Sequence, residues 1–174
     1  DFCLSRGLGD VYKRQAQQIF YDMSVVEDAM TAVSVGVRER GVSAMHDATE
    51  CGIWGGLFEL AQAANLGIRL EKERIIIKDC VEDICNFFAI DPYISISEGT
   101  LIIACREHKA EEIVEALSRK GILSSIVGEL VNPKYGMILT EEGKERKLEH
   151  PLVDPFWDAF YRALEKYASK GVEG

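Results

Sequence analysis

Positive charge is scarce in this sequence, and so are long hydrophobic runs. Lys and Arg number 20 against 29 Asp and Glu, which gives a formal net charge of −9. Nucleic-acid binding rests on clustered Lys and Arg that neutralise phosphates, so this balance argues against a nucleic-acid partner. No apolar run approaches the ~20 residues of a membrane-spanning helix, and no signal peptide is visible. We therefore expect neither a nucleic-acid nor a membrane partner.

Cysteine is also used sparingly. The five cysteines stand at positions 3, 51, 80, 85 and 105, with no CxxC pair and no Cys/His spacing typical of zinc sites. On a helix, Cys80 and Cys85 point roughly 140° apart, so they cannot easily share a metal ion. We expect reduced thiols, no metal site and a cytoplasmic location.

The beginning of the chain has no initiator Met and no amphipathic period. Residues 1–15 (DFCLSRGLGDVYKRQ) look like translated read-end sequence, and we expect a non-native or disordered leader there. A native flexible arm is the alternative. Residues 16–174 are long enough for one domain with its own core, and the 47% hydrophobic content is typical of a globular chain.

Helical and strand patterns alternate from Ser24 onward. Ser24, with Glu27 three residues later, has the spacing of a helix N-cap. Apolar periodicity predicts further helices over 51–65, 79–90, 107–120 and 154–169, and strands over 42–46, 68–70, 100–105, 122–131 and 135–140, the last able to pair with 146–149. The expected class is α/β or α+β, a mixed sheet with helices 51–65, 107–120 and 154–169 packed mainly on one face. Phe156, Trp157 and Phe160 of the last helix are expected in the core.

The run 44–61 (AMHDATECGIWGGLFELA) holds the clearest candidate site. A strand ends at His46, a polar loop with Asp47, Thr49 and Glu50 follows, and a glycine-containing helix begins at once. The free N–H groups and positive dipole at a helix start suit an anion such as phosphate. The alternative stays open: Asp47 or Thr49 can simply cap the helix, and the glycines can serve tight packing.

These residues also resemble a known superfamily. Residues 45–52 (MHDATECG) with 57–61 (LFELA) are similar to the Asp-x-Thr-x-Gly-Gly loop and helix of the hydrogenase-maturation carbamoyl dehydratases. They are also similar to aminoimidazole ribonucleotide (AIR) synthase-related proteins of unassigned role. The likeness continues through 67–68 (GI), 91–92 (DP), 96–101 (ISEGTL), the helix at 109–117 and 126–129 (IVGE). The tail with His150-Pro151 and 154–157 (DPFW) looks like the unassigned subgroup.

The resemblance implies a PurM-like C-terminal domain from a two-domain, ATP-dependent enzyme. In such families the N-terminal half pairs as a homodimer and binds ATP with magnesium, and the C-terminal domain closes the cleft. On that likeness, Asp47, Thr49, Glu50 and Gly52 line the cleft for a small-molecule or phosphate-bearing substrate, where their loop meets the Glu98–Gly99 turn. Glu98 is then the candidate proton-handling carboxylate; a solvent-exposed turn residue is the alternative.

Several features limit these expectations. No Gly-rich phosphate loop with a Lys is present, so we expect no cofactor on this chain alone and no activity without a nucleotide half. Cys51 stands where many relatives have Gly, either as a plain substitution or as a thiol activated by the helix start. The tail carries no modifiable cysteine, which argues against nitrile-forming chemistry on it. His46, His108 and His150 are scattered, and we expect structural or surface roles.

Two other functions remain open. One is a non-catalytic small-ligand or partner-binding α/β module. The other is a selenophosphate-synthetase-like protein, whose N-terminal Cys or selenocysteine region has no counterpart here for comparison.

Overall fold

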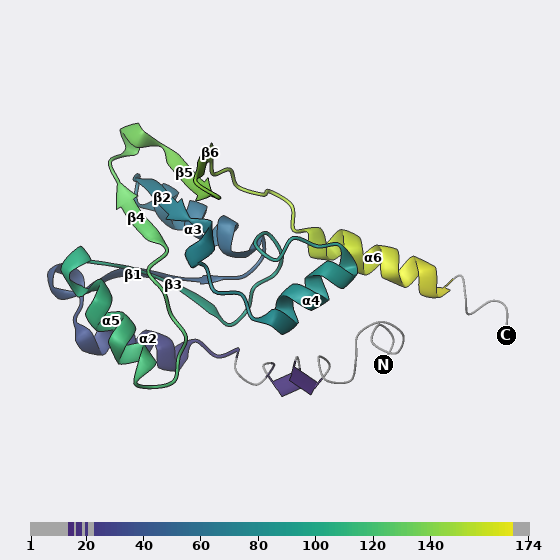
Figure 1. The fold of residues 1–174 in the computed structure, drawn as a ribbon, viewed down its shortest axis with the longest axis horizontal. Helices are drawn as coiled ribbons and strands as arrows, with labels where there is room; N and C mark the ends of the chain where they lie inside the picture. Colours follow the sequence, from purple (N-terminus) through teal and green to yellow (C-terminus); the bar gives the residue numbers. More distant parts are fainter. Residues whose placement is uncertain (1–13, 16, 19, 21–22, 169–174) are drawn as a thin grey trace.

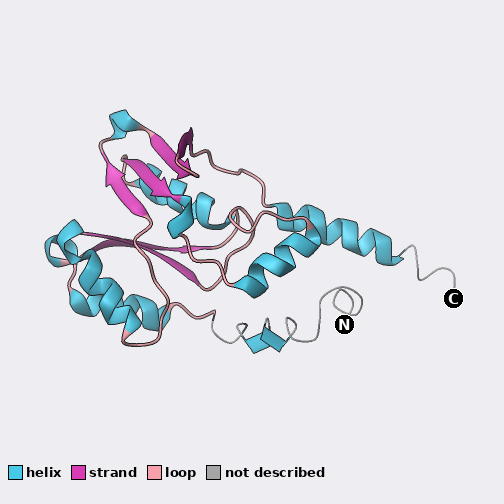
Figure 2. Ribbon diagram, in the orientation of Figure 1, coloured by secondary structure: helices cyan, strands magenta, loops and turns pink. Residues whose placement is uncertain are grey.

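Helices and strands alternate along the chain, as Figures 1 and 2 show. The structure is a computed structural model that describes residues 14, 15, 17, 18, 20 and 23–168, so most of the predicted leader at 1–15 lies outside it. The helices are α2 (Val26–Val35), α3 (Gly52–Ala63), α4 (Asp79–Phe88), α5 (Ala110–Ser118) and α6 (Pro155–Ala168). The strands are β1 (Val42–Ala48), β2 (Gly67–Glu71), β3 (Thr100–Cys105), β4 (Gly128–Val131), β5 (Met137–Glu141) and β6 (Lys144–Lys147).

The strands form two sheets. β1 and β3 make an antiparallel ribbon in which Ala48 pairs with Thr100 and Met45 with Ile103. The second sheet has the order β4-β2-β5-β6, with β2 and β5 parallel and the other pairs antiparallel. The β5–β6 turn is the dipeptide Glu142-Gly143, and both residues have positive φ, which matches the twist that a two-residue hairpin requires.

Helix α3 lies at the centre of the molecule because its apolar side chains contact both sheets. Its buried Trp54, Leu57 and Leu60 share one core cluster with Ile102 of the ribbon and Leu139 of the four-stranded sheet. A second cluster joins α2 and α5 to the ribbon. Its buried members are Ala32, Val42, Ile113 and Leu117, with Ile103 packed against them. Since neighbouring strand residues face opposite ways, Ile102 and Ile103 place α3 on one face of the ribbon and α2 with α5 on the other.

The α+β class and the mixed sheet are confirmed, and the predicted inward residues Leu57, Leu60, Ile113 and Leu117 are all buried. Strand 100–105 matches β3 in full, whereas only Gly128–Val131 of the predicted strand 122–131 forms. The Ser24 cap is wrong, because α2 begins after Val25 and has no side-chain cap. Helix α5 packs on the β1–β3 ribbon, which the sequence patterns did not separate from the main sheet.

The last predicted helix forms, but its aromatic side chains are not in the core. Helix α6 projects beyond α4 away from the sheets (Figure 1), and Trp157 and Phe160 are 42% and 43% exposed. These rings contact one another along the helix, with Phe156 and Phe160 stacked at 5.9 Å. Among the described residues, no helix is both long and apolar enough to cross a membrane.

Candidate functional site

The loop after β1 and the turn before β3 meet at one end of the ribbon. The register pairs Ala48 with Thr100, which places Asp47 and Glu98 at the same end. One backbone hydrogen bond joins the two segments directly, because the N–H of Ser97 donates to the carbonyl of Thr49 over 3.1 Å. The structure therefore brings together the two segments that the sequence singled out, while the roles of their residues stay predictions.

The predicted site residues differ in exposure. Asp47, Thr49, Glu50 and Glu98 are exposed, so their side chains are available to a ligand. Gly52 is buried, and a Cβ at this position would lie 2.6 Å from the carbonyl oxygen of Tyr93. In this structure Gly52 permits close packing beneath the loop and does not itself line an open surface.

The segment that covers Gly52 is held by the aromatic side chains around it. The ring of Tyr93 stacks on Trp54 with centroids 5.0 Å apart, and the carbonyl of Tyr93 accepts the Trp54 N–H over 3.1 Å. The side chain of Lys72 lies over the Tyr93 ring, with its Nζ 4.6 Å from the ring centroid. The chain leading to Glu98 is thereby fixed against the first turn of α3.

The first turn of α3 has an unusual backbone. Cys51 has φ 63° and Gly52 has φ 62°, so two consecutive residues adopt the left-handed conformation. The Cys51 N–H donates to Oδ2 of Asp154 over 2.8 Å, and the Gly52 N–H donates to the Thr49 carbonyl over 3.2 Å. The carboxylate in contact with this helix start is thus a side chain of the same molecule, and the attraction of the helix start for an external anion stays a prediction.

Asp154 joins this loop to α6. Asp154 is 4% exposed, and its Oδ1 accepts the Phe156 N–H over 2.9 Å while Oδ2 accepts the Cys51 N–H. Asp followed by Pro is a favourable helix start, because the side chain caps the first turn and Pro155 needs no hydrogen-bond partner for its nitrogen. The sequence pattern predicts this helix start, whereas the second contact, with Cys51 103 residues away, leaves no local pattern.

Two histidines that the sequence left scattered meet on one carboxylate. Glu59 of α3 accepts from His46 Nε2 at 3.0 Å and from His150 Nε2 at 3.1 Å. The Leu152 N–H donates to His150 Nδ1 over 2.9 Å, so the neutral His150 ring carries its proton on Nε2. The hydrogen bond from His46 lowers the pKa of Glu59, the hydrogen bond from His150 adds to this, and partial burial opposes both. His46 and His150 are thus hydrogen-bond partners of Glu59.

The Cys51 thiol is not activated by the helix start. Its pKa is raised, first by burial and then by the negative charges of Asp154, Glu59 and Glu50. A raised pKa keeps the thiol protonated and weakly nucleophilic at neutral pH. Of the two alternatives for Cys51, the structure favours the plain substitution.

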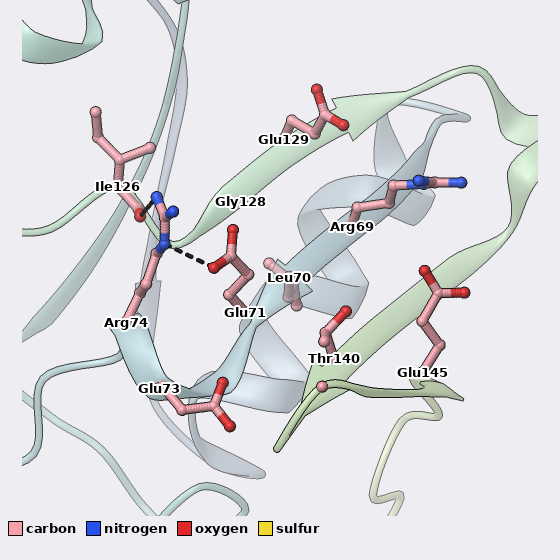
Figure 3. Close-up of a pocket in the computed structure, with 11 residues that line it drawn as sticks. Arg69, Leu70, Glu71, Glu73, Arg74, Ile126, Gly128, Glu129, Thr140 and Glu145 are labelled. Carbon is pink, nitrogen blue, oxygen red and sulfur yellow. Dashed lines mark hydrogen bonds and ion pairs between the residues drawn. The ribbon is translucent and has the colours of Figure 1, made fainter.

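A separate cavity of about 550 Å³ lies on the four-stranded sheet and contains none of the predicted site residues. Its wall carries charges of both signs, and Figure 3 shows Arg74 held by Glu71 and by the carbonyl of Ile126. Arg69 and Glu129 extend from neighbouring strands of the same wall. Across the described part of the chain, no group of three or more His, Cys, Asp or Glu side chains is arranged to hold a metal ion.

Comparison with known proteins agrees with this architecture. Residues 2–162 match the family described as "AIR synthase related protein, C-terminal domain". A hydrogenase expression/formation protein of Methanocaldococcus jannaschii is 31% identical over 123 residues, covering 68% of this chain and 37% of that protein. The carbamoyl dehydratase HypE of Escherichia coli is 29% identical over 144 residues, covering 80% of this chain and 43% of that protein.

Solved structures give the same result. A crystal structure of Escherichia coli HypE, a hydrogenase maturation protein, superposes with a TM-score of 0.64 at 28% identity, over 75% of this chain and 41% of that one. HypE in complex with ATP, at 22% identity and a TM-score of 0.56, shares the fold. The chain thus spans less than half the length of these relatives. It belongs to the AIR synthase-related C-terminal domain family and is related to the HypE hydrogenase-maturation proteins.

Proposed function

We propose that this chain is the substrate-side domain of an ATP-dependent enzyme similar to AIR synthase or to the hydrogenase-maturation proteins, and that it closes a phosphate or substrate cleft over an N-terminal nucleotide domain. The observation that carries the proposal is the meeting of the Asp47–Gly52 loop with the Glu98–Gly99 turn, joined by the Ser97–Thr49 hydrogen bond. Three exposed carboxylates and an exposed hydroxyl lie in these two segments, at one end of the ribbon.

The chemistry of this end limits what it binds. Asp47, Glu50 and Glu98 repel a bare phosphate, so a phosphate-bearing substrate reaches them most readily as its magnesium complex, since carboxylate oxygens are favoured magnesium ligands. Thr49 can donate a hydrogen bond to the same ligand. Glu98 stands in a turn before β3, where it can accept a proton from a substrate that Asp47 and Thr49 orient.

The nucleotide belongs to the other half of the enzyme in this proposal. The chain spans less than half the length of its relatives, and solved HypE structures include one in complex with ATP and one of a HypE–HypF complex. Those ligands and partners are properties of those proteins. For the whole protein that contains this chain we propose ATP with magnesium, a homodimer formed through the N-terminal half and a cytoplasmic location.

A partner-binding module without catalysis is the second candidate. It is favoured by one observation, the exposed aromatic face of α6, on which Trp157, Phe160 and Tyr161 are 42%, 43% and 58% exposed. Contiguous exposed apolar patches mark interaction surfaces in many proteins.

The two candidates are separated by the substitution Glu98→Gln in the full-length protein. If Glu98 handles a proton, ATP-dependent turnover should fall about 100-fold or more while the unfolding temperature stays unchanged. Glu107→Gln is the matched control, because Glu107 is an exposed carboxylate just beyond the opposite end of β3. Turnover that survives Glu98→Gln unchanged would leave Glu98 as a turn residue, as expected if this domain binds a partner and takes no part in the chemistry.

A further inference from the structure

The segment between β6 and α6 is fastened to α3 at two points, one at the start of the helix and one about two turns further along it. His150 bonds to Glu59 of α3, and Asp154 bonds to the Cys51 N–H at the helix start. Leu148, at the beginning of the segment, is 1% exposed and belongs to the central core. The His150-Pro151 and Asp154-Pro155 dipeptides therefore occupy fixed positions beside the candidate site.

We propose that Asp154 is the positioning residue of this site. Its carboxylate holds the end of the Asp47–Gly52 loop, where Cys51 and Gly52 are left-handed, and connects that loop to the start of α6. The role of this site in substrate binding rests on the function proposed above. The holding of the loop rests on the geometry alone and can be tested without any ligand.

The backbone at Cys51 shows why the loop needs to be held. A residue with a Cβ is disfavoured at φ 63°, and it stays there only when the surrounding structure compensates. The compensating contact is a charge-assisted hydrogen bond of 2.8 Å that the Cys51 N–H donates to the carboxylate of Asp154, a residue that is 4% exposed. Exchange with water is limited at such a site, so the bond is stronger than a surface equivalent.

The two oxygens of Asp154 explain why a carboxylate is needed. Oδ2 accepts from Cys51 and Oδ1 accepts from Phe156, so one side chain serves two donors on elements that are distant in sequence. An Asn has one acceptor oxygen. Asn caps a helix about as well as Asp, and it would place an N–H donor against one of the two N–H groups. Asp154→Asn therefore separates helix capping from loop positioning.

The test compares hydrogen exchange of residues 49–56 in the unchanged chain and in Asp154→Asn. We expect exchange in this segment to become about tenfold faster or more, with exchange in α5 unchanged. Asp158→Asn is the matched control, since Asp158 is an exposed carboxylate on the same helix and its ion pair is with Arg162, one turn further along that helix. Unchanged exchange at 49–56 in Asp154→Asn would overturn the inference.

A second readout excludes general loosening of the fold. Removing the Asp154 charge takes away one cause of the raised Cys51 pKa, so alkylation of Cys51 should begin at lower pH, with the profiles of Cys85 and Cys105 unchanged. A parallel shift at all three thiols would indicate loss of structure and overturn the inference.

The third readout is rescue by glycine. Cys51→Gly removes the cost of the left-handed conformation, so Asp154→Asn should accelerate exchange at 49–56 less in that background. An equal acceleration in both backgrounds would overturn the claim that Asp154 compensates for Cys51. If the loop opens as expected but turnover of the full-length protein is unaffected, the positioning holds and the proposed function of the loop fails.

Discussion

Glu59 joins three parts of the molecule through one side chain. It stands on α3 and binds His46, 13 residues before it, and His150, 91 residues after it. Because both imidazoles stabilise the charged carboxylate, its pKa in the folded protein lies below its ordinary value near 4.5. A depressed pKa means that the interaction stabilises the fold above pH 4.5 and is lost as the pH falls through the folded-state pKa.

Replacing this carboxylate should change the pH dependence of stability. We expect Glu59→Gln to lower the free energy of unfolding at neutral pH and to flatten its decline in acid, because no depressed carboxyl pKa remains at this position. The measurement is urea unfolding from neutral pH down to about pH 3, spanning ordinary carboxyl pKa values. Glu129→Gln, an exposed carboxylate on β4, is the control. Parallel pH curves for Glu59→Gln and the unchanged chain would contradict the prediction.

Gly52 and Gly121 form a natural pair for testing the close approach under the loop. Both have positive φ, but a Cβ at Gly52 would meet the Tyr93 and Ser95 carbonyls, whereas a Cβ at Gly121 meets nothing within 4 Å. We expect Gly121→Ala to cost about 1 kcal/mol from backbone conformation alone. Gly52→Ala should cost about 3 kcal/mol or more, because the backbone must also move. Equal losses in denaturant unfolding would show that the steric contact is relieved easily.

At the scale of elements, α3 and α6 have opposite relations to the rest of the molecule. Both have apolar side chains at helical spacing, yet those of α3 are enclosed between two sheets while those of α6 remain largely exposed. The difference lies in position. Helix α3 follows β1 and packs between the two sheets, whereas α6 extends away from the sheets beyond Asp154 (Figure 1).

Truncations in the two helices should therefore differ in cost. Leu57 is 3% exposed, and Leu57→Ala should lower the free energy of unfolding by about 2–5 kcal/mol. Phe160 is 43% exposed, so Phe160→Ala should cost about 1 kcal/mol or less. Denaturant unfolding of the two variants checks this order. A large loss for Phe160→Ala would mean that α6 is packed in solution against a surface that the structure does not show.

Two features of the whole molecule bear on nucleotide binding: its negative net charge, and its length of less than half that of its relatives. The net charge is −9, and the chain spans 43% of the Escherichia coli carbamoyl dehydratase that it matches. A net charge of −9 opposes the binding of a nucleoside triphosphate, so the proposed division of labour assigns the nucleotide to the other half of the enzyme.

Calorimetry with Mg-ATP tests this division of labour. We expect the 174-residue chain to show no micromolar binding and no hydrolysis, because the nucleotide half supplies most phosphate contacts in the proposed enzyme. The full-length protein, titrated under the same conditions, is the positive control. Micromolar binding by the chain alone would contradict the proposal and would make the Asp47–Gly52 loop the first candidate for the binding site.

The local elements of this protein follow from sequence periodicity. The α3 stripe with Leu57 and Leu60, the strand at 100–105 and the Asp154-Pro155 helix start are each encoded by neighbours within a turn or a strand. The meeting of the Asp47 loop with the Glu98 turn was expected on the family resemblance, and the antiparallel register of β1 and β3 places the two segments at one end. Local pattern cannot tell whether an apolar stripe finds a surface to cover, and for that reason the burial of Trp157 and Phe160 was predicted wrongly.

The sequence by itself determined the α+β class, most of the helices and strands, and which loop and turn carry the candidate site. The tertiary structure alone decided that Asp154 binds Cys51 and that His46 and His150 share Glu59, because these partners are 13 to 103 residues apart. Such contacts leave no periodic signal along the chain. They form only when α3 is packed between the two sheets, which brings its first turn and its polar side against the segment that leads into α6.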